Sequence, residues 1–165
     1  MSGTGSLRPT ETRRVAVADE LTYCTFELDG LFFGVEVLAV QEVIRSQQMT
    51  PVPLAHHVVT GLINLRGQVV TAVDLRRRVG LADRPEGVEP MNVVVRTPEG
   101  PVSLLVDEIG DVLEVQDAQF EPAPETLDGG IADLVTGVYK LDGRLLLVLD
   151  IDRALQLPSL SGSEG

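Results

Sequence analysis

The chain has 165 residues and a net charge of −12, and 44% of its residues are apolar although only 4% are aromatic. This length corresponds to about one domain, with a hydrophobic core built mainly from Val and Leu. The negative charge argues against binding to nucleic acid or to an anionic membrane surface, because both require a positive protein face. One cysteine and two histidines leave no basis for a disulfide framework or a Cys/His zinc site.

The two ends of the chain differ in composition from its middle. Residues 1–20 contain Gly, Ser, Thr, Pro and scattered charges, without the apolar core of a signal peptide. The sequence also lacks a run of about 20 apolar residues that would span a bilayer. We therefore expect a cytoplasmic protein without membrane insertion, in which residues 21–158 form one domain and residues 1–20 and 159–165 are disordered tails.

Between these ends, apolar residues mostly recur with a period of two, which is typical of β-strands. Asp29-Gly30 separates two such runs, and both residue types tolerate the positive φ of a two-residue hairpin turn. The same kind of turn is predicted at Arg66-Gly67, Glu99-Gly100 and Asp142-Gly143. The pattern predicts nine or ten short strands, as in small barrels or sandwiches.

Three short helices are predicted between the strands. Residues 38–45 carry apolar side chains at helical spacing. Residues 75–79 follow Asp74, and residues 151–157 follow Asp150. An Asp in this position favours a helix start, because its side chain accepts a hydrogen bond from a free backbone N–H of the first turn.

Residues 58–79 and 134–155 form an internal repeat. When the two segments are aligned without gaps, seven pairs are identical, including Gly61 and Gly137. Two similar strand–turn–strand–helix units in one small chain indicate two related β-subdomains. Since units of about 70 residues bury little apolar area alone, we expect the two to share an interface.

The search for catalytic residues finds no nucleophile, phosphate-binding or metalloprotease motif. Cys24 lies on the apolar face of a predicted strand, which favours a buried, unreactive thiol. Asp107, Glu108 and Asp150 are carboxylates of a type used in acid–base catalysis, but turn and helix-cap roles explain them more simply. A small acidic β-barrel enzyme is therefore a remote alternative.

Arg66 is the residue whose position most suggests a binding role. It is the only Lys or Arg between Arg45 and Arg76. It occupies the first position of a predicted turn that favours Asn or Asp, and the second copy of the repeat has Asp142 there. A locally unfavourable Arg is either a functional residue or a solvated turn residue, and the local pattern does not decide between them.

Five segments, in order, resemble the CheW family of adapter proteins in bacterial chemotaxis signalling. They are FELDGLFFGVEVLAVQEVI (26–44), TPVP (50–53), VVTGLINLRGQVVTAVDLR (58–76), LVDEIGDVLEV (105–115) and VTGVYKLDGRLLLVLDI (135–151). The likeness covers residues 22–157. One departure is Thr71, where the family often has Pro.

The resemblance implies an all-β fold of two five-stranded SH3-like β-barrel subdomains packed on a common core, with a few short helices. It implies a non-catalytic chemotaxis adapter without cofactor or metal. Such an adapter couples the cytoplasmic tips of transmembrane chemoreceptors to the regulatory domain of the histidine kinase CheA. An adapter of a different receptor–kinase pathway, in motility or development, is the alternative.

The resemblance also implies a set of receptor-binding residues, carried over position by position. They are Val40, Glu42, Gly61, Arg66, Val93, Val94, Ser103 and Ile109. Because the resemblance places Glu42 and Arg66 near the same site, the two side chains are also candidates for an ion pair. Core packing remains the alternative for the valines, a backbone requirement remains the alternative for Gly61, and no kinase-facing residues are assigned.

Overall fold

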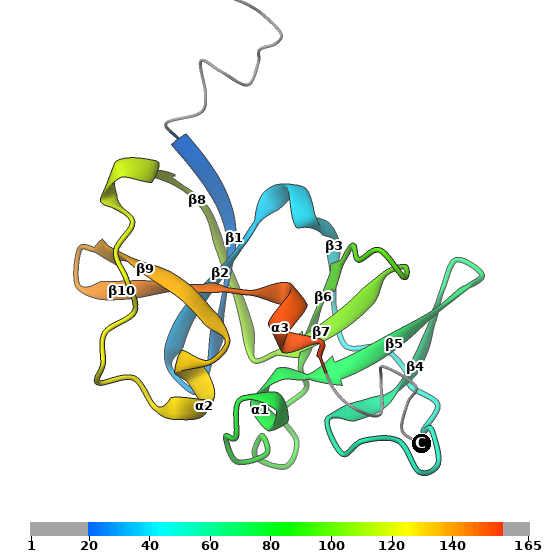
Figure 1. Ribbon diagram of the computed structural model, residues 1–165. Coiled ribbons are helices and arrows are strands. Elements are labelled where there is room, and N and C mark those ends of the chain that lie inside the picture. The colour runs from blue at the N-terminus through cyan, green and yellow to red at the C-terminus, as the bar shows by residue number, and fades with distance from the viewer. Residues whose placement is uncertain (1–19, 157–165) are drawn as a thin grey trace, which may run out of the picture.

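The computed structural model describes residues 20–156, which form ten strands in two five-stranded sheets (Figure 1). The first sheet contains β1 (Glu20–Leu28), β2 (Leu31–Glu36), β8 (Glu108–Gln116), β9 (Val135–Leu141) and β10 (Arg144–Leu149), in the order β8-β1-β2-β10-β9. The second contains β3 (Val40–Ile44), β4 (Val59–Leu65), β5 (Gln68–Asp74), β6 (Met91–Val95) and β7 (Val102–Val106), in the order β3-β6-β7-β5-β4. The all-β class, the strand count and the division into two five-stranded subdomains are confirmed.

Short helices connect the strands. They are η1 (Val37–Ala39), α1 (Leu75–Arg78), η2 (Asp117–Gln119), α2 (Gly129–Ala132) and α3 (Ile151–Ala154). The two helix starts predicted from an N-cap Asp are confirmed: Asp74 accepts a hydrogen bond from the N–H of Arg76, and Asp150 accepts one from the N–H of Arg153. The sequence reading missed α2, whose first turn is capped by Asp128.

The helix predicted over residues 38–45 is wrong. The chain forms only the single 3-10 turn η1 there and then continues as β3, which pairs antiparallel with β6. Val43 lies opposite Val93, and Ile44 lies opposite Asn92. A short apolar run fits the helical and the strand period almost equally well. Val and Ile favour extended backbone, and pairing with β6 then selects the strand.

Two of the four predicted turns have positive φ at both central residues, whereas at Asp142-Gly143 only Gly143 does. Asp29 and Gly30 have φ values of +50° and +82°, and Arg66 and Gly67 have φ values of +52° and +85°, as type I′ turns require. The turn predicted at Glu99-Gly100 is centred one residue earlier, since Thr97 and Gly100 exchange the backbone hydrogen bonds that close it.

The internal repeat is present in the folded chain. The strands β4 and β5 and the helix α1 begin at Val59, Gln68 and Leu75, and their counterparts β9, β10 and α3 begin at Val135, Arg144 and Ile151. The offset between the two copies is thus the same for all three elements. In each sheet the second strand of the repeat lies parallel to a further strand: β5 beside β7, and β10 beside β2.

The two sheets differ in how the chain builds them. The first sheet combines the N-terminal hairpin of the chain, β1 and β2, with its three last strands. The second sheet is continuous in sequence, from β3 to β7. The chain therefore leaves the first sheet after β2, completes the second, and then returns.

One hydrophobic core joins the two sheets. It contains Phe26 and Phe33 from the first sheet and Leu104 and Val93 from the second, all almost completely buried. A smaller cluster around Tyr139 packs within the first sheet alone. The common core expected for the two subdomains is thus confirmed.

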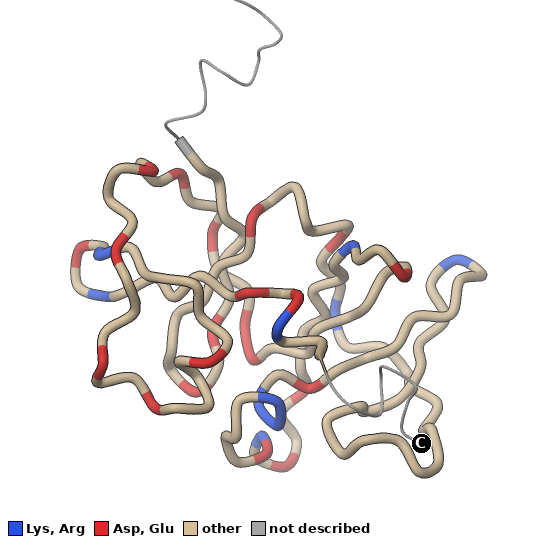
Figure 2. The backbone as a smooth tube through the Cα atoms, viewed as in Figure 1, with Lys and Arg blue, Asp and Glu red and all other residues tan. Residues whose placement is uncertain are grey.

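Charge is distributed unequally between the two halves, as Figure 2 shows. Residues 37–106, which hold the second sheet, contain seven Arg against six Asp and Glu, a net charge of +1. The other described residues, 20–36 and 107–156, contain three Lys and Arg against sixteen Asp and Glu, a net charge of −13. Almost all of the negative charge therefore belongs to the first-sheet half.

The predicted tails, residues 1–20 and 159–165, lie outside the described residues except for Glu20, which is the first residue of β1. The folded unit predicted over 21–158 therefore begins within one residue of β1. Between residues 20 and 156, no helix is long and apolar enough to cross a membrane.

Candidate functional site

Arg66 stands at the tip of the β4–β5 hairpin, in the left-handed backbone region. This conformation is uncommon for a residue other than Gly, Asn or Asp. The turn is fastened by the side chain of Asn64, which accepts a 2.9 Å hydrogen bond from the N–H of Gly67. The Arg66 side chain is 74% exposed, so the hairpin holds a cationic group out in solvent at a fixed place.

The guanidinium of Arg66 forms a bidentate ion pair with Glu42 on β3. The two nitrogen–oxygen distances are 2.5 and 2.7 Å. Hydrogen bonding from Arg66 lowers the pKa of the Glu42 carboxyl, and the Glu42 side chain is only 17% exposed. The pairing considered from the sequence is confirmed, although Glu42 lies on a strand and not on the predicted helix.

This ion pair joins β3, one end strand of the second sheet, to the tip of the hairpin that contains β4, the other end strand. Strands at opposite ends of a five-stranded order come together only if the sheet curls, as it does in a small barrel. Glu42 thereby holds the guanidinium against the β3 edge. A guanidinium has five N–H donors in a planar fork, and a bidentate carboxylate leaves the rest to face solvent.

Exposed apolar side chains extend this edge. Val40 is half-buried at the start of β3, whereas Leu38 in η1 is 83% exposed and Val43 is 38% exposed. Arg96 fixes the η1 backbone by donating hydrogen bonds to the carbonyls of Leu38 and Val40, at 2.9 and 2.8 Å. The sequence analysis did not select Leu38, because its candidates were carried over from the resemblance and Leu38 was not among them.

Three of the candidate residues lie beneath this edge and not on it. Val93, Val94 and Ser103 are each at most 1% exposed. Val94 lies opposite Glu42 in the β3–β6 pairing and opposite Ser103 in the β6–β7 pairing. The Ser103 hydroxyl donates a 2.7 Å hydrogen bond to the side-chain oxygen of Asn92. Side chains so deeply buried can support the β3 edge but do not line a contact surface.

Gly61 is required by a close backbone approach. A Cβ added there would lie 2.7 Å from the carbonyl oxygen of Thr50, which forms an isolated bridge with Leu62. Its repeat equivalent, Gly137, would bring a Cβ equally close to the Glu121 carbonyl oxygen. The glycines that the repeat shares therefore let a preceding loop cross the first strand of each unit.

Ile109 lies apart from the other candidates. It belongs to β8 in the first sheet, where it is half-buried, packs on the common core and lies opposite Phe26. The Arg66–Glu42 pair belongs to the second sheet. The structure thus gathers Val40, Glu42 and Arg66 at one edge and places Ile109 in the other subdomain.

A sequence model of the CheW-like domain matches residues 22–159. The chain belongs to this family. It is similar to the chemotaxis protein CheW of Thermotoga maritima, with 31% identity over 137 residues that cover 83% of this chain and 89% of the relative. It is also similar to the chemotaxis protein CheW of Rhizobium meliloti, with 32% identity over 127 residues that cover 77% and 82% of the two chains.

The fold agrees with this CheW-like assignment. The crystal structure of the scaffolding protein TtCheW from Thermoanaerobacter tengcongensis superposes with a TM-score of 0.75 at 23% identity, and covers 84% of this chain and 94% of that one. At this level of identity the match shows a shared fold. The strand count and the internal repeat had indicated two related β-subdomains, and the resemblance had implied that they are barrels.

Asp107, one of the three carboxylates considered for catalysis, is part of a structural cluster in this CheW-like domain. Asp107 accepts hydrogen bonds from Arg76 at 2.7 and 2.9 Å and from the N–H of Asp29 at 2.7 Å, and Arg84 lies 3.0 Å away. Burial alone would raise the pKa of Asp107, but these hydrogen bonds outweigh it, so the pKa is lowered. Asp107 is therefore an ionised acceptor with its oxygens engaged.

The other groups considered for chemistry have ordinary structural surroundings in the CheW-like domain. Cys24 is partly buried against the core, and burial raises the pKa of its thiol, which disfavours the reactive thiolate. Asp150 caps α3, and Glu108 is exposed on β8. Across residues 20–156, no group of three or more His, Cys, Asp or Glu side chains is arranged to hold a metal ion.

Proposed function

We propose that this CheW-like domain is a non-catalytic adapter that couples transmembrane chemoreceptors to the histidine kinase CheA. The observation that carries the proposal is the family match over residues 22–159, together with relatives that are named chemotaxis proteins. An adapter needs exposed contact surfaces and no reaction centre. This role places the protein in the cytoplasm, at the membrane-associated receptor arrays.

The receptor-facing surface in this proposal is the β3 edge, with Val40, Glu42 and Arg66 at its centre. Val93, Val94 and Ser103 support it from behind through the strand pairings of β3, β6 and β7. Leu38 and Val43 add exposed apolar area to the same edge. Ile109 and Gly61 are assigned indirect roles, since one belongs to the other sheet and the other is buried against Thr50.

The mixture of apolar and charged side chains at this edge suits a helical partner that presents both kinds of side chain, such as a receptor hairpin. Apolar side chains at the centre of an interface provide affinity, whereas charged groups at the rim fix the register and favour correct encounters. Arg66 is held in place by Glu42 before any partner arrives. A guanidinium that is already positioned loses less conformational freedom on binding.

A reconstituted assembly of receptor, kinase and this protein tests the function. We expect the kinase to be activated by receptors only when the protein is added, and we expect it to co-purify with both partners. Kinase activity that is the same with and without the protein, in an assembly of receptors and kinase from the same organism, would contradict the proposal. Co-purification with a kinase and receptors of a motility or development pathway would instead assign it to that pathway.

A further inference from the structure

The 3-10 turn η1 has few contacts of its own to hold it. It is the cyan turn between β2 and β3 in Figure 1, and it is closed by one backbone hydrogen bond, from the N–H of Val40 to the carbonyl of Val37. None of its three residues is buried, and Leu38 is 83% exposed. A single turn is only marginally stable in water without tertiary contacts, so groups outside η1 must fix its conformation.

Arg96 supplies these contacts. Its backbone N–H donates a 2.9 Å hydrogen bond to the carbonyl of Ala39, and its Nη1 donates to the carbonyls of Leu38 and Val40, at 2.9 and 2.8 Å. One residue thus satisfies three successive carbonyls at the end of a turn, where carbonyls have no partner within the helix. The two guanidinium bonds are charge-assisted and therefore stronger than bonds between neutral groups. Together, the three bonds fix the peptide groups that follow Leu38.

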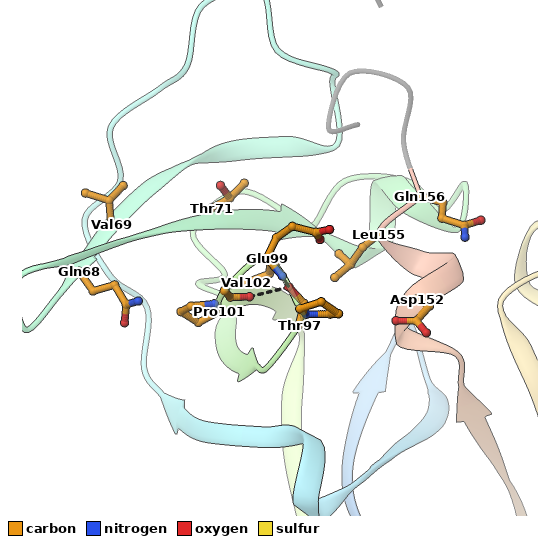
Figure 3. Close-up of a pocket in the computed structure, with 12 residues that line it drawn as sticks. Gln68, Val69, Thr71, Thr97, Glu99, Pro101, Val102, Asp152, Leu155 and Gln156 are labelled. Carbon is orange, nitrogen blue, oxygen red and sulfur yellow. Dashed lines mark hydrogen bonds between the residues drawn. The ribbon is translucent and has the colours of Figure 1, made fainter. Parts of the chain in front are cut away.

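Arg96 is itself held on a rigid base. It directly follows β6, whose last four residues, 92–95, are buried. Thr97 then begins the β6–β7 turn, in which its hydroxyl donates a 2.6 Å hydrogen bond to the carbonyl of Gly100 and accepts one from the N–H of Glu99. Figure 3 shows this turn at the edge of a groove. Because both neighbours of Arg96 are fixed, its side chain starts from a defined place.

The far end of β3 has a separate attachment. The side-chain amide of Asn92, which is completely buried, donates a 3.0 Å hydrogen bond to the carbonyl of Arg45. β3 is an end strand paired with β6, and its register shifts between Val40 and Glu42. Loss of the Arg96 bonds should therefore release η1, while β3 beyond Glu42 stays in place.

We infer that Arg96 is a positioning residue of the receptor-facing edge: it orders η1 and thereby presents Leu38 and Val40 to the receptor before binding. The inference rests on the proposed function, because it names a residue that prepares the same surface. Ordering the turn in advance removes part of the conformational cost of binding. Where a binding conformation is populated only part of the time, the apparent affinity is reduced by that fraction.

Backbone ¹⁵N relaxation of the protein in the absence of partners tests whether Arg96 orders η1. In Arg96→Ala, the order parameters of amides 38–40 should fall from about 0.85 to below about 0.6. The amide of Gly67 in the β4–β5 turn should keep its value, which shows in the same spectrum that the variant is folded. Arg144→Ala is the matched control, because it removes the same charge from the first sheet, where Arg144 pairs with Glu27. Unchanged order at residues 38–40 in Arg96→Ala would overturn the inference.

Receptor binding tests whether this order matters. The probe is the cytoplasmic fragment of a chemoreceptor from the same organism. Arg96→Ala should bind it about tenfold more weakly, as expected if η1 keeps its conformation about a tenth of the time, whereas Arg144→Ala should bind like the unmodified protein. In a Leu38→Ser background, the loss caused by Arg96→Ala should shrink to about threefold, because the side chain that Arg96 positions is already gone.

Arg96→Lys separates position from charge. It keeps a cation but lacks the planar fork, so its order parameters and its affinity should both lie between those of the unmodified protein and those of Arg96→Ala. Full affinity with a disordered η1 would show that the charge acts on the receptor directly, which would overturn the inference.

Two further outcomes separate the inference from the proposed function. An equal tenfold loss with and without Leu38→Ser would show that Arg96 itself contacts the receptor, and would overturn the positioning role. An unmodified protein that does not bind the fragment would overturn the proposed function, and the relaxation data would then decide whether Arg96 orders η1.

Discussion

Arg66 combines a costly backbone conformation with an exposed functional group. An Arg with φ of +52° sits in a region that Gly, Asn or Asp occupies more readily. Glu42 fixes its guanidinium without burying it, because the Arg66 side chain remains 74% exposed. A surface ion pair of this kind adds little to folding stability, so the arrangement is better explained by contact with a partner.

Arg66→Ala should therefore leave the melting temperature within a few degrees of the unmodified protein, while weakening receptor binding and kinase activation in the reconstituted assembly. The ion pair is exposed, so its loss costs little stability, but the partner loses a positioned cation. A melting curve run beside the assembly assay separates the two effects. Normal kinase control by the variant would contradict the site, and a collapsed melting curve would make Arg66 structural.

Two further variants refine the Arg66 test. Arg66→Lys should restore function only in part, because an ammonium cannot reproduce the planar fork. The charge swap Arg66→Glu/Glu42→Arg keeps an ion pair between β3 and the β4–β5 turn, yet should restore assembly poorly, since the cation no longer lies at the hairpin tip. Full recovery by the swap would show that the pair matters only to the fold.

Gly61→Ala should destabilise the fold by about 1–3 kcal/mol, as overpacking typically does. The added methyl would meet the Thr50 carbonyl oxygen at 2.7 Å, and a backbone atom in a bridged loop moves less readily than a side chain. Gly129→Ala is the matched control, because nothing lies within 4 Å of its Cβ position. Urea denaturation of both variants measures the difference, and equal midpoints would contradict the proposed role of Gly61.

At the scale of elements, an ion-pair cluster ties the two sheets together. Asp107 is the single residue between β7 of the second sheet and β8 of the first. Its partner Arg76 belongs to α1, and Asp29 belongs to the β1–β2 turn. The cluster therefore fixes the point where the chain crosses from one sheet to the other.

The cluster makes stability depend on pH. Folding lowers the pKa of Asp107, so its contribution is fully present above the unfolded value of about 4 and is lost as pH falls through the folded value. Asp107→Asn should be clearly less stable than the unmodified protein at pH 7, and the gap should narrow below about pH 4. Thermal melting across this range measures it, with the exposed neighbour Glu108→Gln as control. A gap that stays constant with pH would contradict the role of the charge.

Sequence reasoning succeeded for these elements where the signal was local. The type I′ turns and the Asp caps of α1 and α3 depend on a few adjacent residues, and their stereochemistry is specific. The repeat added long-range information, because two copies of one pattern at separate places in the chain imply two similar units.

It failed where the deciding partner is distant in sequence. β3 was predicted as a helix because a short apolar run does not reveal its pairing partner. That partner, β6, begins only at Met91. Val93 and Val94 were selected by resemblance, although consecutive apolar residues are also the pattern of a strand buried on both faces. Nothing local in the sequence joins Asp107 to Arg76, which lies in a different element of the fold.

For the whole molecule, the shared core predicts a single unfolding transition. Phe33 and Leu104 come from different sheets, yet belong to one cluster, so neither subdomain keeps its core when the other unfolds. NMR signals of Tyr139 in the first sheet and Val94 in the second should lose intensity with the same urea midpoint. Two separate midpoints would show that the subdomains are independently stable.

The order of strands along the chain also sets an order of events during synthesis. The second sheet is complete once Val106 has been made, whereas β2, which ends at Glu36, must wait for β10, which begins at Arg144. At roughly 5–20 residues per second, that wait lasts roughly 5–20 s. Throughout it, Phe26 and Phe33 have no completed core to enter, so the nascent N-terminal hairpin keeps apolar side chains exposed. A circular permutant opened between Glu36 and Val37 would make both sheets continuous and abolish the delay.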